Sequence, residues 1–328
     1  PSSQIKQIIG IIIGIIVMLV ISMIDYEWLL NLYWLIYGFN LFLLLYVHFF
    51  GMELNGAKRW INLFGFTTLQ PSDFTKFLMN HEARMKEPLT IVKAVLLIAP
   101  SLLLIYKQPN LSNTLCIAAL FCILMYIGGL SYKFIATALA IAIPAAIIVV
   151  SIAVMPNQPF LEKYQQKRIL AWLEPEKYAD DTAYQQQNSI MAIGSGQLKG
   201  KGLNNNTTTS VKNGKFLLEA DTDFIFAIIG EELGFVGCCI VIILLLLIVI
   251  QCILIGLKAK DTGGRIICGG VAALIGIQSF INISVATLIL PNTGLSVPFV
   301  SYGLTSVVCF FMGIGLVLNV GLQPNKYQ

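Results

Sequence analysis

The sequence predicts an all-α protein, a polytopic bundle of membrane helices with a large extracellular loop. Of its 328 residues, 57% are hydrophobic and only 12% are charged, whereas about a quarter of the residues are charged in a typical soluble domain. Apolar runs recur from end to end, and each crossing of a bilayer core needs roughly 20 such residues. We therefore expect a single transmembrane domain over residues 1–328.

Eight apolar segments are predicted to span the membrane, and four polar loops between them carry most of the motifs. The predicted spans are residues 5–24, 28–50, 90–106, 114–130, 134–155, 224–257, 265–290 and 304–320. The loops are residues 51–72, 107–113, 156–223 and 291–303. The stretch after Asp73 is too short to span, although alternation requires a crossing before the basic residues at 84–93. Because the first segment leads into another membrane helix, we expect no cleavable signal peptide.

The basic residues of the short connections indicate which side of the membrane each loop faces. Cytoplasmic loops are enriched in Lys and Arg, and alternation places all the basic connections on one side. These connections contain Arg84, Lys86, Lys93, Lys133, Lys258, Lys260 and Arg265. The four motif-bearing loops then lie outside the cell, where Lys58 and Arg59 depart from the rule and suggest an anionic ligand. The net charge of +4 is too small to indicate a nucleic-acid partner.

The cysteines are interpreted as small buried apolar side chains. They lie inside or at the edges of apolar runs, without a CxxC pair or a partner histidine, so neither disulfides nor metal ligands are expected. The seven are Cys116, Cys122, Cys238, Cys239, Cys252, Cys268 and Cys309.

Residues 56–76 gather charges around a tryptophan-bearing turn. Pro71 favours a helix start, and Asp73 complements the dipole of that helix, so capping explains Asp73 about as well as function does. Lys76 stands one turn into a membrane helix, where a charge is costly unless it is paired or hydrated. Asp73 and Lys76 are spaced to pair on one face. A snorkelling side chain is the alternative for Lys76, and we favour a functional role.

The loop 156–223 is too long to lack structure in a compact domain, so we expect an ordered lid or platform. Ile190, Met191 and Ile193 suggest a short helix against the membrane surface. The glycines at 194, 196, 200 and 202 resemble a phosphate-cradling loop, which alone is a weak signal.

Asp221 and Asp223 form a D-x-D immediately before the long apolar run that starts at Phe224. A carboxylate there is explained about equally well by a helix cap and by function, as a general base or a ligand of a divalent cation. Glu231 and Glu232 follow two turns later, at membrane depth, and at least one of them is expected to face a polar interior.

The loop 291–303 is a Pro- and Gly-punctuated break between two spans. Irregular backbone at this depth is tolerated where protein or a water-filled cavity shelters it. Hydroxyl side chains follow the break, and they are suited to a polar head group. They belong to Ser301, Tyr302, Thr305 and Ser306.

Six of these segments, in this order, make the chain resemble the SEDS family, the group of RodA, FtsW and SpoVE. They are NGAKRWI (55–61), QPSDFTK (70–76), KQPN (107–110), AIGSGQLKGKGL (192–203), TDFIFAIIGEELGFVG (222–237) and TGLSVPFVSYG (293–303). The last of them leans toward the RodA type. Counterparts of the family's first helix and of most of its fourth are not apparent in the sequence.

The resemblance implies a bundle of ten transmembrane helices that polymerises lipid II, with its motif loops at the outer face. The family's essential Asp falls on Asp223, and the charged pair after its QPS motif falls on Asp73 and Lys76. The chain departs from the family where Asp73 replaces Glu, where QPNLSNT replaces QPDLGT and where SYGLTS replaces SYGGSS.

The mechanism implied is attack of an acceptor sugar hydroxyl on an anomeric carbon that carries undecaprenyl-pyrophosphate. Asp223 would accept the proton, with or without a divalent cation, Mg²⁺ or Mn²⁺, for which Asp223 is the candidate ligand. The residues expected to bind substrate or pyrophosphate are Lys58, Arg59, Asp73, Lys76, Lys199, Lys201, Ser301 and Thr305. Those expected to support the site are Gln70, Pro71, Gln108 and Glu232.

The resemblance also implies a class B penicillin-binding protein, a transpeptidase, as partner, and a place in the bacterial cytoplasmic membrane with the active site facing outside. Two alternatives stay open, a lipid II flippase and a non-catalytic scaffold for a transpeptidase. A flippase needs polar groups through the full depth of the membrane, whereas here they gather at one face. The choice between elongation, division and sporulation also stays open.

Overall fold

The computed structural model of the chain describes residues 3–50, 52–54, 57–60, 77–81, 87–107, 111–155, 163–178, 183–203 and 220–323. The chain forms two compact units. Unit 1 comprises Pro1–Tyr132, Leu246–Ile277 and Tyr302–Gln328, and unit 2 comprises Lys133–Leu245 and Gln278–Ser301. The predicted single transmembrane domain stays a prediction.

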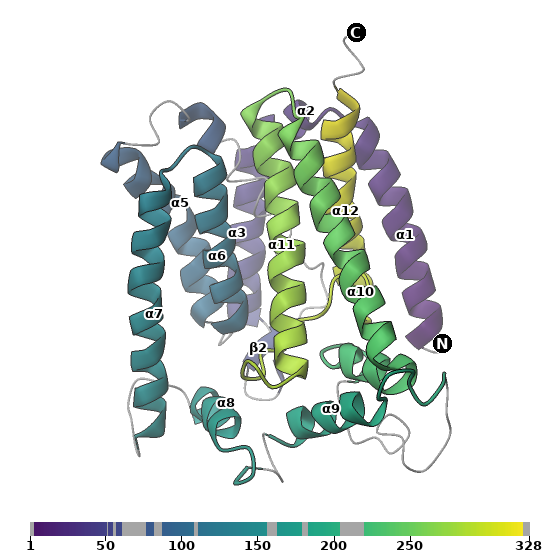
Figure 1. The fold of residues 1–328 in the computed structure, drawn as a ribbon. Helices are drawn as coiled ribbons and strands as arrows, with labels where there is room; N and C mark the ends of the chain where they lie inside the picture. Colours follow the sequence, from purple (N-terminus) through teal and green to yellow (C-terminus); the bar gives the residue numbers. More distant parts are fainter. Residues whose placement is uncertain are drawn as a thin grey trace. The chain divides into compact units, whose positions relative to one another are not determined.

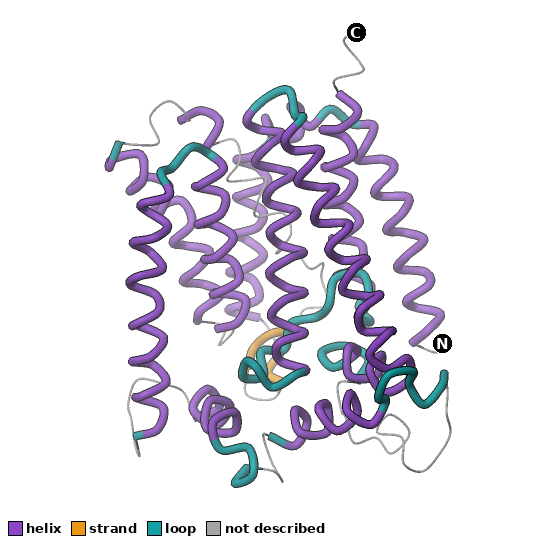
Figure 2. The backbone as a smooth tube through the Cα atoms, in the orientation of Figure 1, coloured by secondary structure: helices purple, strands orange, loops and turns teal. Residues whose placement is uncertain are grey.

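The described elements are helices apart from one short hairpin, as Figures 1 and 2 show. The helices are α1 (Ser3–Met23), α2 (Tyr26–Asn31), α3 (Tyr33–Phe50), α5 (Pro88–Lys107), α6 (Leu111–Ile127), α7 (Tyr132–Val154), α8 (Lys163–Leu173), α9 (Tyr184–Ser195), α10 (Ile225–Leu257), α11 (Thr262–Ala286) and α12 (Leu304–Leu322). The antiparallel strands β1 (Met52–Leu54) and β2 (Ala57–Trp60) form the hairpin, which lies within a segment predicted to be a loop.

In the described part of the chain, six helices are long and apolar enough to cross a membrane, and two shorter apolar helices match the remaining predicted spans. The six segments are Gln4–Met23, Pro88–Tyr106, Tyr132–Val154, Ile225–Leu257, Thr262–Ala286 and Leu304–Leu322, and the shorter ones are Trp34–Tyr46 and Ser112–Ile127. The prediction of an all-α polytopic membrane protein is confirmed. One span differs, because residues 28–50 are not continuous: α2 ends at Asn31 and α3 begins at Tyr33.

The cysteines of the described chain are free thiols, and five of the seven are buried. The prediction that the cysteines are small buried side chains is confirmed for these five.

In unit 1, α1 and α12 lie side by side (Figure 1) because glycines let their backbones approach. A Cβ added to Gly14 would lie 2.4 Å from the ring of Phe311, and one added to Gly315 would lie 2.8 Å from the carbonyl oxygen of Met18. Small residues are the usual means of close helix contact in membranes, where no hydrophobic force draws helices together.

The end of α12 is joined to the end of α1 by one buried amide. Asn319 is 1% exposed. Its Nδ2 donates to the carbonyl oxygens of Ile21, Ser22 and Ile24, and its Oδ1 accepts from the backbone N–H of Tyr26. The last carbonyls of α1 have no partners within their own helix, so Asn319 supplies the missing donors.

The Asn319→Leu variant is expected to lower the free energy of unfolding by about 2 kcal/mol, because it leaves buried carbonyls without donors. Thermal unfolding in detergent measures the loss. Leu322→Ala is the control, since Leu322 is 48% exposed, and it should shift stability much less. Equal losses in the two variants would show that the amide contributes nothing specific.

A second polar contact joins α2 to the start of α11. The buried hydroxyl of Tyr26 donates to Asp261 Oδ1 at 2.7 Å, and the same oxygen accepts from the backbone N–H of Gly264 at 2.8 Å. Burial, and after it the hydrogen bond to Asp261, raises the pKa of Tyr26 well above its usual value. The folded state therefore holds the phenol proton more tightly than the unfolded chain does.

This tighter hold makes the stabilisation by Tyr26 dependent on pH. It is fully present below the pKa of an unfolded tyrosine, about 10, and is lost as pH rises beyond it. The stability gap between wild type and Tyr26→Phe should therefore narrow between about pH 9 and about pH 11, as followed by thermal unfolding. Tyr132→Phe, at a position 68% exposed, is the control; a gap that stays constant with pH would contradict the prediction.

In unit 2, α9 packs against the end of α11 with polar side chains. Gln186 Nε2 donates to the carbonyl oxygens of Val285 and Leu290, at 3.0 Å and 2.9 Å, and the Ser189 hydroxyl donates to that of Ala286 at 2.7 Å. Because α11 ends at Ala286, the bond from Ser189 satisfies a carbonyl that its last turn leaves open, whereas Val285 also accepts from the backbone N–H of Leu288.

The outer side of α9 is apolar. Met191 is 57% exposed and Ile190 is 38% exposed, whereas Ala192 is buried against Phe224 and Ala227 of the next segment. The predicted short helix is therefore present within the loop 156–223. Its position against the membrane surface stays a prediction.

Candidate active site

Asp223 lies in the turn before α10, with its backbone held by two neighbouring segments of unit 2. Asn282 Nδ2 of α11 donates to the carbonyl oxygen of Asp223 at 2.7 Å, and the Ser301 hydroxyl donates to that of Thr222 at 2.7 Å. A Cβ added to Gly294, where φ is +71°, would lie 3.4 Å from Asp223 Oδ2. The clamps use backbone oxygens, and the carboxylate lies beside Gly294 of the loop 291–303.

Asn282 holds the turn at Asp223, and it was not predicted from the sequence. It is 1% exposed, and its Nδ2 also donates to the carbonyl oxygen of Leu295, so it ties α11, the turn at Asp223 and the following loop together. The signal in the sequence is an amide inside an apolar span, which is costly unless its bonds are satisfied.

Ser301 was predicted to offer its hydroxyl to a head group. It is 3% exposed, and besides donating to Thr222 it accepts from the backbone N–H of Val297 at 2.8 Å. These bonds give Ser301 a role in positioning the turn at Asp223. Its contact with a head group stays a prediction.

Arg168 places a cation beside the loop 291–303. From α8, its Nη1 donates to the carbonyl oxygen of Asn292 at 3.2 Å, and Trp172 of the same helix donates Nε1 to that of Leu288 at 3.1 Å. Asn292 stands two residues before Gly294, the residue that lies against Asp223. Arg168 was not predicted as a site residue, since an arginine in a long polar loop has no distinguishing pattern.

Helix α10 breaks at Gly234, which has φ 67° and ψ −165°. This backbone conformation is open only to glycine. Residues 225–233 therefore form a short helical segment directly after Asp223, separate from the apolar length of α10 that follows.

The turns after α9 fill the break. The N–H groups of Lys201 and Gly202 donate to the carbonyl oxygens of Glu231 and Glu232, at 2.9 Å and 3.0 Å. In return the N–H of Phe235 donates to the carbonyl oxygen of Gln197 at 2.8 Å. These bonds replace those that the break removes from α10.

The glycines of this region serve close backbone contact. A Cβ added to Gly196 would lie 1.9 Å from the carbonyl oxygen of Gly230, and one added to Gly200 would lie 2.2 Å from that of Glu232. Packing against α10 thus accounts for Gly196 and Gly200, and the phosphate-cradling role stays a prediction.

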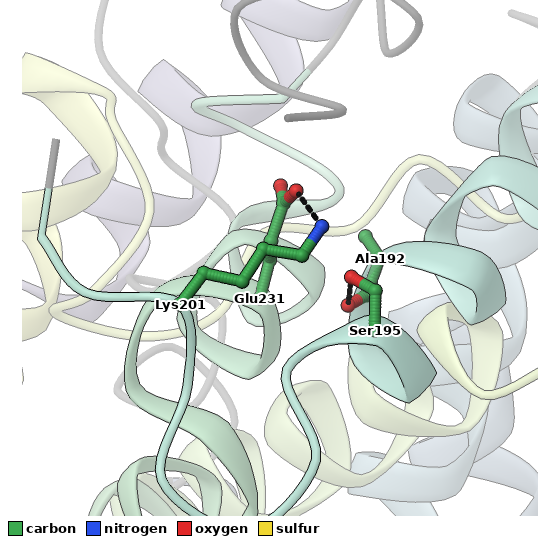
Figure 3. A network of polar contacts seen from close by, with 4 residues as sticks. All are labelled: Ala192, Ser195, Lys201 and Glu231. Atoms are coloured by element: carbon green, nitrogen blue, oxygen red, sulfur yellow. Dashed lines mark hydrogen bonds and ion pairs between the residues drawn. The ribbon is translucent and has the colours of Figure 1, made fainter. Parts of the chain in front are cut away.

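Lys201 and Glu231 form an ion pair across this contact (Figure 3). Lys201 Nζ lies 2.9 Å from Glu231 Oε1; the Glu231 side chain is 1% exposed and that of Lys201 is 22% exposed. In the same view the Ser195 hydroxyl donates to the carbonyl oxygen of Ala192, closing the end of α9. The expectation that at least one of Glu231 and Glu232 faces a polar interior is met by Glu231.

The other predicted site residues fall in several places. Lys199 is exposed in the turn after α9, and Glu232 is half-buried in α10. Thr305 belongs to the first turn of α12, in unit 1. Lys58 and Arg59 lie in β2, with side chains outside the described part. Gln70, Pro71, Asp73, Lys76 and Gln108 lie outside the described residues.

No group of three or more His, Cys, Asp or Glu side chains able to hold a metal ion occurs in the described part of the chain. Mg²⁺ is commonly bound by one or two carboxylates together with substrate phosphates. Asp223 fits that arrangement, in which the substrate supplies the remaining ligands, and the cation stays a prediction.

Comparison with known proteins identifies the family of this chain. The sequence model of the FtsW, RodA and SpoVE family of cell cycle proteins matches residues 2–326. The chain belongs to this family. Among its FtsW/RodA/SpoVE relatives are the protein named "Probable peptidoglycan glycosyltransferase FtsW" of Trichlorobacter lovleyi and the peptidoglycan glycosyltransferase MrdB of Escherichia coli. The first is 33% identical over 96% of this chain and 82% of its own length, and the second is 31% identical over 96% and 84%.

Two solved structures share the fold of this chain. A chain of a peptidoglycan synthase complex that coordinates polymerization and crosslinking is 25% identical, with a TM-score of 0.77 over 100% of this chain and 91% of its own. The rod shape determining protein RodA of Thermus thermophilus is 23% identical, with a TM-score of 0.68 over 100% and 89%. At that identity the RodA likeness shows the fold alone.

Proposed function

We propose that this chain is a peptidoglycan glycosyltransferase, which transfers glycan from an undecaprenyl-pyrophosphate donor to lipid II. Its relatives are named for peptidoglycan glycosyltransferase activity and match almost its whole length. The observation that carries the proposal is Asp223, a half-buried carboxylate at the start of a membrane helix whose backbone is clamped by Asn282 and Ser301. A general base needs such a fixed position near its substrate.

The proposed reaction forms one bond and breaks another. The acceptor sugar's hydroxyl oxygen bonds to the donor's anomeric carbon, and its proton passes to Asp223, directly or through a water. The bond from that carbon to the pyrophosphate oxygen breaks, and the pyrophosphate leaves with the electron pair. The cations proposed to stabilise its charge are Lys58, Arg59, Lys76 and Lys199.

The proposed active site faces the outside of a bacterial cytoplasmic membrane. Asp223 precedes α10, whereas Lys258 and Lys260 follow its other end. Since basic residues of short loops mark the cytoplasmic side, the opposite end of this multi-pass protein is the outer one. Lipid-linked sugars would then reach Asp223 from the outer leaflet.

The proposed partner is a transpeptidase, a class B penicillin-binding protein. Support comes from the similar chain that works within a peptidoglycan synthase complex, where polymerization and crosslinking are coordinated. A polymerase and a transpeptidase act on the same strand, which favours their physical association.

The deciding experiment incubates the purified, detergent-solubilised protein with lipid II, with and without a divalent cation and a class B transpeptidase. Glycan strands resolved by size are the expected product. Folded protein that makes no strands under any of these conditions would overturn the proposal. Movement of lipid II across vesicle membranes by such inactive protein would favour the flippase alternative.

A further inference from the structure

Asp223 is attached to a helical segment that is fixed at both ends. At its start, Asn282 and Ser301 hold the turn. At its end, α10 breaks at Gly234, and the turns after α9 bond to the carbonyl oxygens of Glu231 and Glu232. Glu231 follows Asp223 by eight positions, and the helical part of that stretch, residues 225–231, rises roughly 9 Å along the axis. A displacement of the helix end at residues 231–234 therefore moves Asp223 as well, because one short helical segment connects them.

The far end holds a buried charge. The Glu231 side chain is 1% exposed, and Lys201 Nζ lies 2.9 Å from its Oε1. Removing one member of a buried ion pair leaves the other charge buried without its counter-ion, which strongly disfavours the packed arrangement. Loss of either charge alone is therefore expected to weaken the contact between the turn at Lys201 and α10.

We propose that the Lys201–Glu231 ion pair is a positioning device, which fixes the segment 225–233 and thereby places the Asp223 carboxylate for proton transfer. This inference rests on the proposed function. Neither residue needs to touch the substrate; both act through the geometry of the segment that carries Asp223.

The geometry favours this role over direct contact of Lys201 with pyrophosphate, the role the sequence suggested. To reach a phosphate, the ammonium group would have to leave a carboxylate that is almost wholly buried. Lys199, two residues earlier, is exposed and meets an anion without breaking a buried pair. The two lysines of this turn thus have different tasks.

A double-mutant cycle separates the two roles. In Lys201→Met, the unpaired Glu231 carboxylate is expected to lower kcat by about 10-fold to 100-fold with little change in KM, since small displacements of a catalytic group cost rates of this order. Adding Glu231→Gln removes the buried charge and should recover the rate several-fold, a coupling expected of groups in contact. Lys201→Arg, which keeps the cation, should stay within about 3-fold of wild type. If Lys201 contacts pyrophosphate instead, adding Glu231→Gln gives no recovery of the rate.

Hydrogen exchange gives a readout that does not depend on polymerase activity. Amides of residues 222–230 should exchange faster in Lys201→Met than in wild type, and the double variant should reverse the change. Lys177→Met is the matched control, because Lys177 pairs with Glu174 at the same 2.9 Å but with side chains 67% and 50% exposed, and it should alter neither rate nor exchange. Unchanged exchange in Lys201→Met would overturn the inference, whereas inactive wild-type protein would overturn the proposed function alone.

Discussion

The Asp223→Asn variant is expected to polymerise lipid II at least about 100-fold more slowly than wild type, because an amide cannot accept the proton of the attacking hydroxyl. Asn has nearly the same shape as Asp, and the bonds from Asn282 and Ser301 go to backbone oxygens. Folding should therefore be retained. Initial rates of strand formation measure the loss, and thermal unfolding in detergent verifies that the variant is folded.

Asp221→Asn is the matched control for this substitution. Asp221 belongs to the same D-x-D, is exposed and lies two residues before Asp223. Its loss should change the rate by less than about 3-fold, in keeping with surface substitutions. Equal losses in the two variants would mean that the acidic turn acts through its overall charge, and full activity of Asp223→Asn would remove Asp223 from the mechanism.

The membrane spans could be predicted from the sequence because their signal is local. A run such as residues 304–320 is apolar over its whole length, and the bilayer fixes how long such a run must be. The break between α2 and α3 escaped the prediction, since Leu32, where the chain turns between the two helices, is itself apolar. Hydropathy measures the cost of leaving water and is insensitive to where a helix is interrupted.

The candidate site was predictable only in part, because its geometry joins residues far apart in the chain. Asp223 stands out by its place at the edge of an apolar run. The ion pair between Lys201 and Glu231 could not be predicted in this way, because it depends on the break at Gly234 and on the turns that fill it. The glycine-rich pattern was visible, but its reason, contact of backbone with backbone, requires the fold.

The Gly196→Ala variant is expected to lower the free energy of unfolding by about 3 kcal/mol and to reduce polymerisation with it. Its added Cβ would lie 1.9 Å from the carbonyl oxygen of Gly230 and 2.9 Å from the carbonyl carbon of the same residue. Because the obstacle is backbone, no side-chain rotation relieves the clash, and α9 must separate from α10. Thermal unfolding and initial rates in detergent measure the two effects.

Gly194→Ala is the control, two residues earlier in α9, where an added Cβ has no atom within 4 Å. Alanine there should be neutral or slightly stabilising, because it favours the helix. A Gly196→Ala variant as stable as wild type would mean that α9 and α10 are not in backbone contact. The helical segment that carries Asp223 would then be held only at its start, by Asn282 and Ser301. A destabilised Gly196→Ala beside a stable Gly194→Ala would instead show that the spacing of these glycines serves the packing of α10 against the turns at 196–202.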